Sequence, residues 1–516
     1  MCKKFILCLN FEHSLMLRKI RIVVAVAVLM CVTALFIDFT GFAVRWCGWL
    51  AGMQFVPAVM ALNVIALAVL LLITVVMGRV YCSVICPLGI MQDCINWMRS
   101  HVGPRRSRRN RFRYTKALTV ARMGVFVLFA LLIATGFTYL AGLLDPYSGY
   151  GRIASALIAP VYDGVNNVLA AEAEGHGSYA FYRVDSVPVM WPVMIVAFLT
   201  LAVVGLMSWF GGRRYCNTIC PVGTILGCLS KLSLLRPVID TSKCNGCRSC
   251  ERNCKASCID ASSHSVDYSR CVVCMDCIDN CRQGAISYTF CNFKRDVAEV
   301  TQPPVDTTRR TFLTAGAVIA GAAAANAAVG KLHDGGLAPI VPKTVPVRKG
   351  RIVPPGAVSV ANLQRRCTAC QACIANCPNG VLRPSMDLAS LLQPEVGYEH
   401  GYCRPECTRC SEVCPAGAIL KIDEAEKSAV HIGYAHVDYE RCLSVSEGVN
   451  CGKCSRKCPA GAIEMAAVDP SDVDGSRLMP VVNESRCIGC GACENLCPVS
   501  PVSAIVVSGY EIHRID

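Results

Sequence analysis

Charged side chains are scarce in this sequence. Asp, Glu, Lys and Arg together make up 17% of its 516 residues, while 53% are hydrophobic and the mean hydropathy is +0.43. These averages fit neither a soluble enzyme nor a pure transporter, and they predict a membrane part joined to a soluble part. No motif of a hydrolytic enzyme is present.

Acidic residues are also in short supply. There are 37 Asp and Glu against 51 Lys and Arg, for a net charge of +14. From residue 331 onwards the two signs balance, at 19 basic and 20 acidic residues, so the excess lies earlier and largely in the loop 99–116. That loop has few aromatics and no nucleic-acid-binding module. We therefore expect no nucleic-acid partner, and we interpret the loop as a marker of the cytoplasmic side of a membrane.

Four segments are apolar enough, and about long enough, to cross a hydrocarbon core of ~30 Å. They comprise residues 20–37, 55–77, 117–140 and 188–210. Basic residues flank the start of the first and the end of the fourth, and the loop 141–187 carries mainly acids. The charge distribution therefore predicts a four-helix membrane domain over residues 1–235, with a cytoplasmic N-terminus and the loop 141–187 outside.

The second and fourth segments end in one repeated motif. Residues 81–89 read YCSVICPLG, and residues 215–223 read YCNTICPVG, at an offset of 134. An acid near a glycine, Asp38 or Asp145, stands at the outer end of the first helix of each pair. The membrane domain is therefore predicted to be two repeated hairpins, and such duplication commonly builds a pseudo-symmetric site at the repeat interface.

Cysteine is far above ordinary usage, and 24 of the 36 cysteines fall into six groups of four. Four groups share the spacing C-x-x-C-x-x-C-x-x-x-C, and the other two lengthen only the first gap. A disulfide framework needs no such repeat, and zinc ribbons pair two C-x-x-C knuckles across a long gap. The repeated spacing is typical of [4Fe–4S] clusters, so we expect six of them.

Two groups follow the fourth apolar segment and predict an α+β bacterial-ferredoxin-like module over residues 236–300. In such modules the fourth cysteine of each group binds the other cluster. One cluster is assigned to Cys244, Cys247, Cys250 and Cys281. The other is assigned to Cys271, Cys274, Cys277 and Cys254.

The remaining four groups predict a four-cluster ferredoxin domain over residues 361–516. They comprise Cys367, Cys370, Cys373 and Cys377; Cys403, Cys407, Cys410 and Cys414; Cys442, Cys451, Cys454 and Cys458; and Cys487, Cys490, Cys493 and Cys497. The first gap of the third group contains eight residues, 443–450, which we interpret as a loop insertion.

Residues 301–335 carry a targeting signal in mid-chain. Arg309 and Arg310 stand in the pattern TTRRTFL, followed by an Ala/Gly-rich run to Gly330. Twin-arginine signals accompany proteins that fold around cofactors before crossing a membrane. A flexible linker with two incidental arginines is the alternative. If the signal works, the Ala/Gly-rich run is either cleaved or forms a fifth, short membrane crossing. The linker 336–360 and the domain after it then lie outside the cytoplasmic membrane.

These motifs resemble two ferredoxin families. Residues 16–291 resemble NapH-type membrane ferredoxins, related to NosR, in their four helices, two C-x-x-x-C-P motifs and two cytoplasmic clusters. Residues 305–516 resemble NapG, a twin-arginine ferredoxin with four clusters. The resemblance implies a NapH–NapG-like fusion in the bacterial inner membrane. It would be the quinol-oxidising component of a complex for anaerobic respiration, passing electrons from menaquinol to an extracytoplasmic partner reductase.

The resemblance also implies a ligand exchange in the C-terminal domain. By similarity to other four-cluster ferredoxins, the first group exchanges its fourth cysteine with the fourth group, and the second with the third. Cys497 would then join the first group and Cys377 the fourth, while Cys458 would join the second and Cys414 the third.

The sequence does not identify the route by which electrons cross the membrane. Clusters on opposite faces would be separated by ~30 Å of hydrocarbon, which is too far for one electron step. Either a partner or a further cofactor bridges this distance, or the last domain stays inside. No histidine lies in the four apolar segments, so a b-type haem with axial histidines is not expected. Asp38 and Asp145 could take up quinol protons or be ordinary helix-end acids.

Four cysteines of the repeated motif should lie at one depth. They are Cys82, Cys86, Cys216 and Cys220. They could hold a seventh cluster, form redox-active disulfides, contact quinone, or remain inert buried thiols.

A maturation or assembly factor for a copper or respiratory enzyme is the alternative function, because related C-x-x-x-C-P membrane ferredoxins serve such roles. The four extra clusters favour a respiratory chain. A scaffold or transporter would leave 24 cysteines unexplained.

Overall fold

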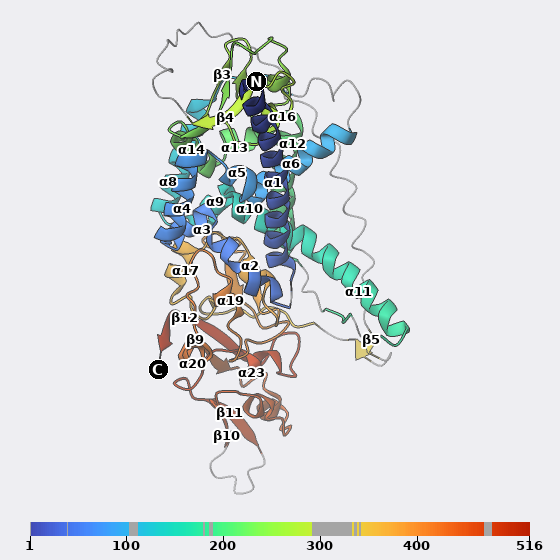
Figure 1. Ribbon diagram of the computed structural model, residues 1–516. Coiled ribbons are helices and arrows are strands. Elements are labelled where there is room, and N and C mark those ends of the chain that lie inside the picture. Colours follow the sequence, from blue (N-terminus) through green and yellow to red (C-terminus); the bar gives the residue numbers. More distant parts are fainter. Residues whose placement is uncertain are drawn as a thin grey trace, which may run out of the picture.

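The computed structural model describes residues 2–38, 40–102, 112–178, 181–184, 189–290, 333–334, 338–339, 342–468 and 477–515. Three regions follow one another along a long axis (Figure 1): a small α+β module, a helical domain in the middle, and a larger α+β domain at the other end. Most of the basic loop (103–111) and the twin-arginine residues Arg309 and Arg310 lie outside the described residues.

The helical domain consists of two hairpins of broken helices. The first contains α1 (Cys2–Ile37), α2 (Phe42–Gly52), α3 (Phe55–Met60), α4 (Val64–Met77), α5 (Tyr81–Val84) and α6 (Pro87–Val102). The second contains α8 (Thr119–Ala134), α9 (Thr138–Leu144), α10 (Pro146–Ile153), a π-helical turn (Ala154–Ile158), α11 (Ala159–Gly175), α12 (Trp191–Gly211), α13 (Arg214–Thr218) and α14 (Pro221–Ser230).

Three helices in the described part of the chain are long and apolar enough to cross a membrane. They comprise Met16–Ile37, Pro146–Gly175 and Trp191–Gly211. The second and third segments expected from the sequence are shorter, because each is interrupted. Leu62, at φ 53°, separates α3 from α4, and Gly136, at φ 84°, separates α8 from α9.

The candidate span Pro146–Gly175 is a long helix within the segment 141–187 that the sequence predicted as an outer loop. Asp145 accepts hydrogen bonds from two backbone N–H groups of the first turn and so starts α10, and a π-helical turn joins α10 to α11. The mean hydropathy of this span is 1.2, well below that of the other two, at 2.8 and 2.4. Its apolar character was therefore hard to recognise in the sequence.

The small module has two antiparallel strand pairs and two short helices. β1 (Leu235–Ile239) pairs with β4 (Ile286–Phe290), and β2 (Ile259–Asp260) pairs with β3 (Ser265–Val266). α15 (Ser249–Arg252) lies between β1 and β2, and α16 (Asp276–Asp279) lies between β3 and β4. The first strand thus pairs with the last and encloses both cysteine groups.

The last part of the chain repeats this order. β9 (Val430–Val437) pairs with β12 (Ile505–Ile515), and β10 (Ile463–Ala467) pairs with β11 (Leu478–Val482). α21 (Leu443–Ser446) and α22 (Lys453–Arg456) precede the inner pair, and α23 (Ala492–Asn495) follows it. Residues 430–515 therefore form a second two-group module with the same strand order.

The segment before it holds the first two C-terminal cysteine groups. It contains α17 (Val360–Arg366), α18 (Ala372–Ala375), β7 (Leu382–Pro384) paired with β8 (Pro394–Val396), α19 (Arg409–Glu412) and α20 (Glu424–Ala429). Here a backbone hydrogen bond from Leu420 to Gly356 joins the two ends of the segment. A further short pair, β5 (His333–Asp334) and β6 (Ala338–Pro339), lies in the preceding linker.

The two α+β regions contact opposite ends of the candidate span Met16–Ile37 of α1. Near its start, Arg18 Nε lies 3.0 Å from Asp276 of the small module. Near its end, the Leu35 carbonyl accepts a hydrogen bond of 2.8 Å from Asn376 of the C-terminal domain. The 17 residues from Arg18 to Leu35 correspond to about 26 Å of helix, close to the ~30 Å of a hydrocarbon core.

Candidate iron–sulfur sites

Two cavities in the small module are walled by cysteines. Site A is lined by Cys244, Cys247, Cys250 and Cys281. Site B is lined by Cys271, Cys274, Cys277 and Cys254, with the extra Cys258 beside them. Each site thus brings together the four cysteines that the sequence analysis assigned to one cluster, including the exchanged fourth cysteine.

A left-handed backbone position shapes these cysteine loops. In five of the six groups, the residue two before the third cysteine has φ between 53° and 76°. These residues are Arg248, Met275, Gln371, Gly452 and Gly491. Non-glycine residues adopt this conformation at a cost, so its recurrence indicates a loop that is shaped for a ligand. The exception is the second C-terminal group, Cys403 to Cys414, where Thr408 has φ −107°.

The C-terminal domain holds four more sites, two of them seen as cavities. Site E is lined by Cys487, Cys490, Cys493 and Cys458. Site F is lined by Cys442, Cys451, Cys454 and Cys497. The third and fourth groups therefore exchange their fourth cysteines with each other.

The first two C-terminal groups pair in the same way. Burial and the nearby thiols of Cys367, Cys370 and Cys414 raise the pKa of the Cys373 thiol well above its ordinary value. Burial and the Cys403 and Cys377 thiols likewise raise the pKa of Cys410. Site C is therefore Cys367, Cys370, Cys373 and Cys414. Site D is Cys403, Cys407, Cys410 and Cys377.

The structure does not bring the expected distant groups together. Cys497 lies with the third group and Cys458 with the fourth, while Cys414 lies with the first group and Cys377 with the second. The physical reason is the strand order: β9 and β12 enclose the third and fourth groups in one module, so each fourth cysteine reaches the other group of its own module.

The exchange can be tested with two serine variants. Cys497→Ser should convert the cluster of site F to a three-iron form or lose it, and should leave site E intact. Cys458→Ser, the matched control, should do the reverse. Electron paramagnetic resonance of the anaerobically purified chain measures both. Loss of the signal from the Cys367 group in the Cys497 variant would restore the distant pairing.

Backbone N–H groups donate hydrogen bonds to cysteine sulfurs in the small module and in the C-terminal domain. The donors are Ala285 to Cys281 at 3.3 Å, Ala369 to Cys367 at 3.4 Å, Ile419 to Cys414 at 3.4 Å, and Ala462 to Cys458 at 3.3 Å. Such donors stabilise thiolate charge and fit an anionic cluster. Within the described ranges, no three His, Cys, Asp or Glu side chains converge as a single metal ion would require.

The six sites follow one another along the molecule. Site B lies in the small module where Lys255, next to Cys254, reaches Asp93 of α6 at 3.5 Å. Site C adjoins the other end of the helical domain, where Thr138 Oγ1 donates to the Cys367 carbonyl at 3.0 Å. A backbone hydrogen bond of 2.9 Å from Cys403 to Cys490 joins sites D and E. Site F lies beyond them, beside β10 and β11 (Figure 1).

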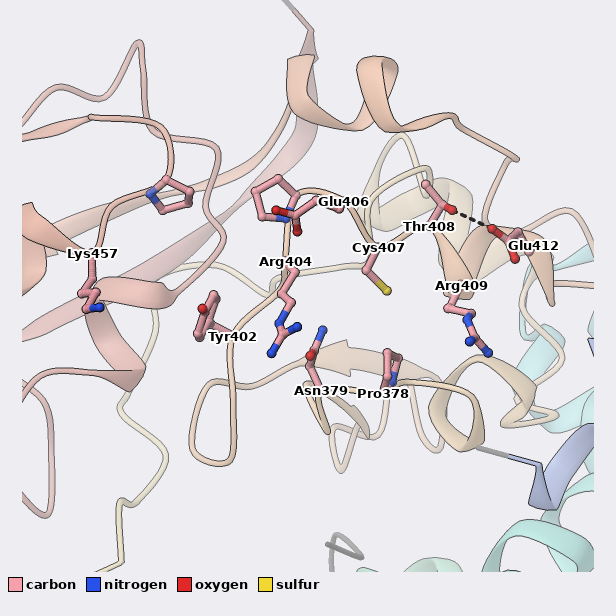
Figure 2. A pocket seen from close by; sticks show the side chains of 12 residues that line it. Pro378, Asn379, Tyr402, Arg404, Glu406, Cys407, Thr408, Arg409, Glu412 and Lys457 are labelled. Atoms are coloured by element: carbon pink, nitrogen blue, oxygen red, sulfur yellow. Dashed lines mark hydrogen bonds between the residues drawn. The ribbon is translucent and has the colours of Figure 1, made fainter. Parts of the chain in front are cut away.

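A cavity of about 800 Å³ opens beside site D. Figure 2 shows Cys407 on its wall between Arg404 and Arg409. Thr408 Oγ1 donates to Glu412 at 2.6 Å, and Lys457 lines another wall. The cavity therefore brings one site D cysteine close to the solvent, in surroundings that carry both signs of charge.

The repeat interface gathers the four motif cysteines of the membrane domain. Cys82, Cys86, Cys216 and Cys220 are each 4–5% exposed and belong to one hydrophobic core. We call them the membrane quartet. Arg79 and Arg213, three residues before the first cysteine of each motif, are fully buried against them, and neither was expected at this site from the sequence. The same offset of 134 would have revealed them.

The two candidate proton acceptors bind the first turns of helices: Asp145 is the N-cap of α10, and Asp38 accepts from the first turn of α2. Asp38 accepts from the Thr40 and Ala43 N–H groups at 2.8 and 2.6 Å. Asp145 accepts from the Ser148 N–H and hydroxyl groups at 2.9 and 2.6 Å and is 1% exposed. Both contacts favour the role of helix-end acids.

Comparison with known proteins agrees with the cysteine chemistry. A family model described as a 4Fe-4S binding domain matches residues 59–105 and 190–239, and one described as a 4Fe-4S dicluster domain matches residues 447–500. The chain is 26% identical over 196 residues to the ferredoxin-type protein NapH of Haemophilus influenzae, which covers 38% of this chain and 54% of that protein.

Two further relatives are methylamine utilization ferredoxin-type proteins MauN. The one from Paracoccus denitrificans is 26% identical over 37% of this chain and 52% of its own length, and the one from Methylorubrum extorquens is 28% identical over 38% and 52%. The chain spans about half the length of these curated relatives. No solved structure matches. The chain is thus a membrane-associated, ferredoxin-type iron–sulfur electron-transfer protein similar to NapH and MauN.

Proposed function

We propose that this protein is the quinol-oxidising component of a respiratory complex in the bacterial inner membrane. It takes electrons from menaquinol and delivers them to a partner reductase outside the cytoplasm. The order of sites A to F along one axis, on both sides of the helical domain, carries this proposal. The similarity to NapH, together with the match of residues 59–105 and 190–239 to a 4Fe-4S binding domain, supports the membrane assignment.

The chain's own residues would hold six [4Fe–4S] clusters in this order. Bound clusters would supply one-electron transfer. The cysteines of sites A to F ligate the irons, and the N–H donors at Cys281, Cys367, Cys414 and Cys458 stabilise the thiolates. Because cubane clusters accept one electron at a time, a series of them suits the stepwise removal of two electrons from a quinol.

Contacts between regions keep the series continuous. Arg152 is fully buried in the helical domain and donates to the Ala369 carbonyl of the site C loop at 3.3 Å. Ser148 Oγ donates to Thr368 of the same loop at 3.0 Å. Site C is therefore held against the helices rather than on a free tether.

Site F is the exit that we propose for the partner reductase. It lies farthest from the helical domain, and its first gap carries the inserted residues 443–450. Val449 of this insertion is 47% exposed. An exposed apolar tip beside a terminal site suits a transient contact with a redox partner.

A quinol-reduction experiment tests the proposal. The anaerobically purified full-length chain should contain at least about 24 iron atoms, from six clusters of four. A menaquinol analogue should bleach the cluster absorbance near 400 nm, and dithionite should set the full amplitude. If dithionite reduces the clusters but the quinol does not, the quinol role is contradicted, while the cluster assignment stands.

The second candidate is a redox maturation factor. The similarity to two proteins named for methylamine utilization favours it, because their names refer to a process other than anaerobic respiration. Deletion of the gene separates the two. Loss of respiration with a mature partner enzyme supports electron delivery, whereas accumulation of an immature partner supports maturation.

A further inference from the structure

Two buried arginines cross between the membrane repeats. Arg79 of the first repeat has Nη2 at 3.7 Å from its own Cys82 Sγ and donates to the Cys216 carbonyl of the second repeat at 3.3 Å. Arg213 of the second repeat has Nη1 at 3.9 Å from Cys216 Sγ and donates to the Cys82 carbonyl at 2.8 Å. Both repeats therefore build one reciprocal site around the membrane quartet.

The other two quartet cysteines stand at helix starts. Cys86 directly precedes α6, and Cys220 is the N-cap of α14, where its sulfur accepts from the Gly223 N–H group at 3.3 Å. A helix N-terminus stabilises negative charge, and both helices have ten residues or more. Gln92 adds a donor to Cys216 Sγ at 3.3 Å.

Two glycines leave room for the arginine contacts between the repeats. A Cβ on Gly89 would lie 2.3 Å from the Cys82 carbonyl and 2.7 Å from Arg213 Nη1. A Cβ on Gly223 would lie 2.1 Å from the Cys216 carbonyl. The glycine of each C-x-x-x-C-P-x-G motif therefore serves the same reciprocal contact.

The buried positive charge of this site is only partly balanced unless a negatively charged group is also present. Arg213 pairs with Asp93 at 2.9 Å. In the described residues Arg79 contacts neutral groups: Asn217 Oδ1 at 2.9 Å, the Ser269 carbonyl at 3.0 Å, the Cys216 carbonyl and the Cys82 sulfur. A fully buried guanidinium without a negative partner is costly, and thiolates of the quartet would supply one.

We propose that the membrane quartet binds a further [4Fe–4S] cluster. Four thiolates from two repeats match its four corner irons, and the arginines, the N–H groups and Gln92 offset its negative charge. A [4Fe–4S] core takes up one electron and releases the same electron, so no proton or other reactant is needed.

The position of the quartet makes this cluster an intermediate carrier between sites B and C. This role rests on the electron path proposed above. Towards the small module, Arg79 reaches the Ser269 carbonyl, two residues before Cys271 of site B. Towards the C-terminal domain, Tyr215, next to Cys216, donates to the Leu144 carbonyl at 3.4 Å. Asp145 follows Leu144 and adjoins the Ser148–Thr368 contact with the site C loop. The quartet therefore divides the distance between sites B and C.

Iron content tests the site on the full-length chain. The unmodified protein should hold about 28 iron atoms, from seven clusters of four. The double variant Cys86→Ser, Cys220→Ser should hold about four fewer and keep the signals of sites A to F. Cys94→Ser, Cys228→Ser is the matched control, because these exposed cysteines occupy equivalent positions of α6 and α14. It should lose no iron.

A second variant leaves all the ligands in place. Arg79→Gln should lower the midpoint potential of the seventh cluster, because a nearby positive charge is removed, without changing the iron content. About 24 irons in the unmodified chain, or iron unchanged by the Cys86 and Cys220 substitutions, would overturn the proposal. A disulfide found by mass spectrometry within the quartet would do so too. Failure of quinol oxidation with 28 irons present would contradict only the proposed substrate.

Discussion

Changing Arg309 and Arg310 to lysine is expected to block export of the C-terminal domain almost completely while the helical domain still inserts. The structure gives this expectation a spatial reason. The small module contacts α1 at Arg18 and the C-terminal domain contacts it at Leu35, so the candidate membrane span Met16–Ile37 lies between the two contacts. If the small module is cytoplasmic, sites C to F must cross before they can dock.

A folding-tolerant reporter after Asp516 measures this, because the twin-arginine route carries folded cargo. The control changes a second arginine pair, Arg365 and Arg366 in α17, to lysine and should leave export unchanged. A cytoplasmic reporter in the unmodified chain would contradict the arrangement and remove the basis for an extracytoplasmic reductase.

Asp93→Asn is expected to destabilise the junction between the small module and the helical domain by about 3–5 kcal/mol, because it leaves the buried Arg213 without its charged partner. Asp93 lies within 3.5 Å of Arg213, Lys255 and Arg21. Burial opposes its ionisation, but these three cations hold its pKa well below the ordinary value.

Thermal unfolding in detergent, followed by loss of cluster absorbance, measures the effect. Asp279→Asn is the control, since its partner Arg18 is 34% exposed and such pairs contribute about 0–1 kcal/mol. A lowered folded-state pKa contributes stability that is present above the unfolded pKa of about 4 and is lost as the pH falls through the folded pKa. The difference between Asp93→Asn and the unmodified chain should therefore stay constant from pH 5 to 8. Equal effects of the two variants would contradict the buried role of Asp93.

The cysteine sites show how much of the cluster assignment follows from the local spacing of the cysteines. The grouping of Cys244, Cys247 and Cys250 was readable because a cluster-binding loop is only a few residues long. The exchange of Cys254 and Cys281 was also readable, because two groups in one short module have a single partner each. With four groups, several pairings are compatible with the same spacing, and the choice of distant groups for Cys377 and Cys497 did not hold.

The membrane domain shows a second limit. The repeat at Cys82 and Cys216 was evident, yet the breaks at Leu62 and Gly136 were not, because apolar composition reports burial in lipid and not helix continuity. The helix that begins at Pro146 was predicted as a loop because it carries polar side chains, of which Arg152 and Ser148 contact the site C loop in the structure.

By itself the sequence determined the chemistry: the cysteine spacings indicated iron–sulfur clusters, the apolar segments indicated a membrane, and the offset of 134 indicated a repeat. Each is a local or periodic property of the chain. Only the tertiary structure decided which fourth cysteine lies with which group, that the two ferredoxin regions dock at opposite ends of the segment Met16–Ile37, and that Arg79 and Arg213 cross between the repeats. Those outcomes depend on contacts between residues more than a hundred positions apart, or on which strands pair, and neither spacing nor composition encodes them.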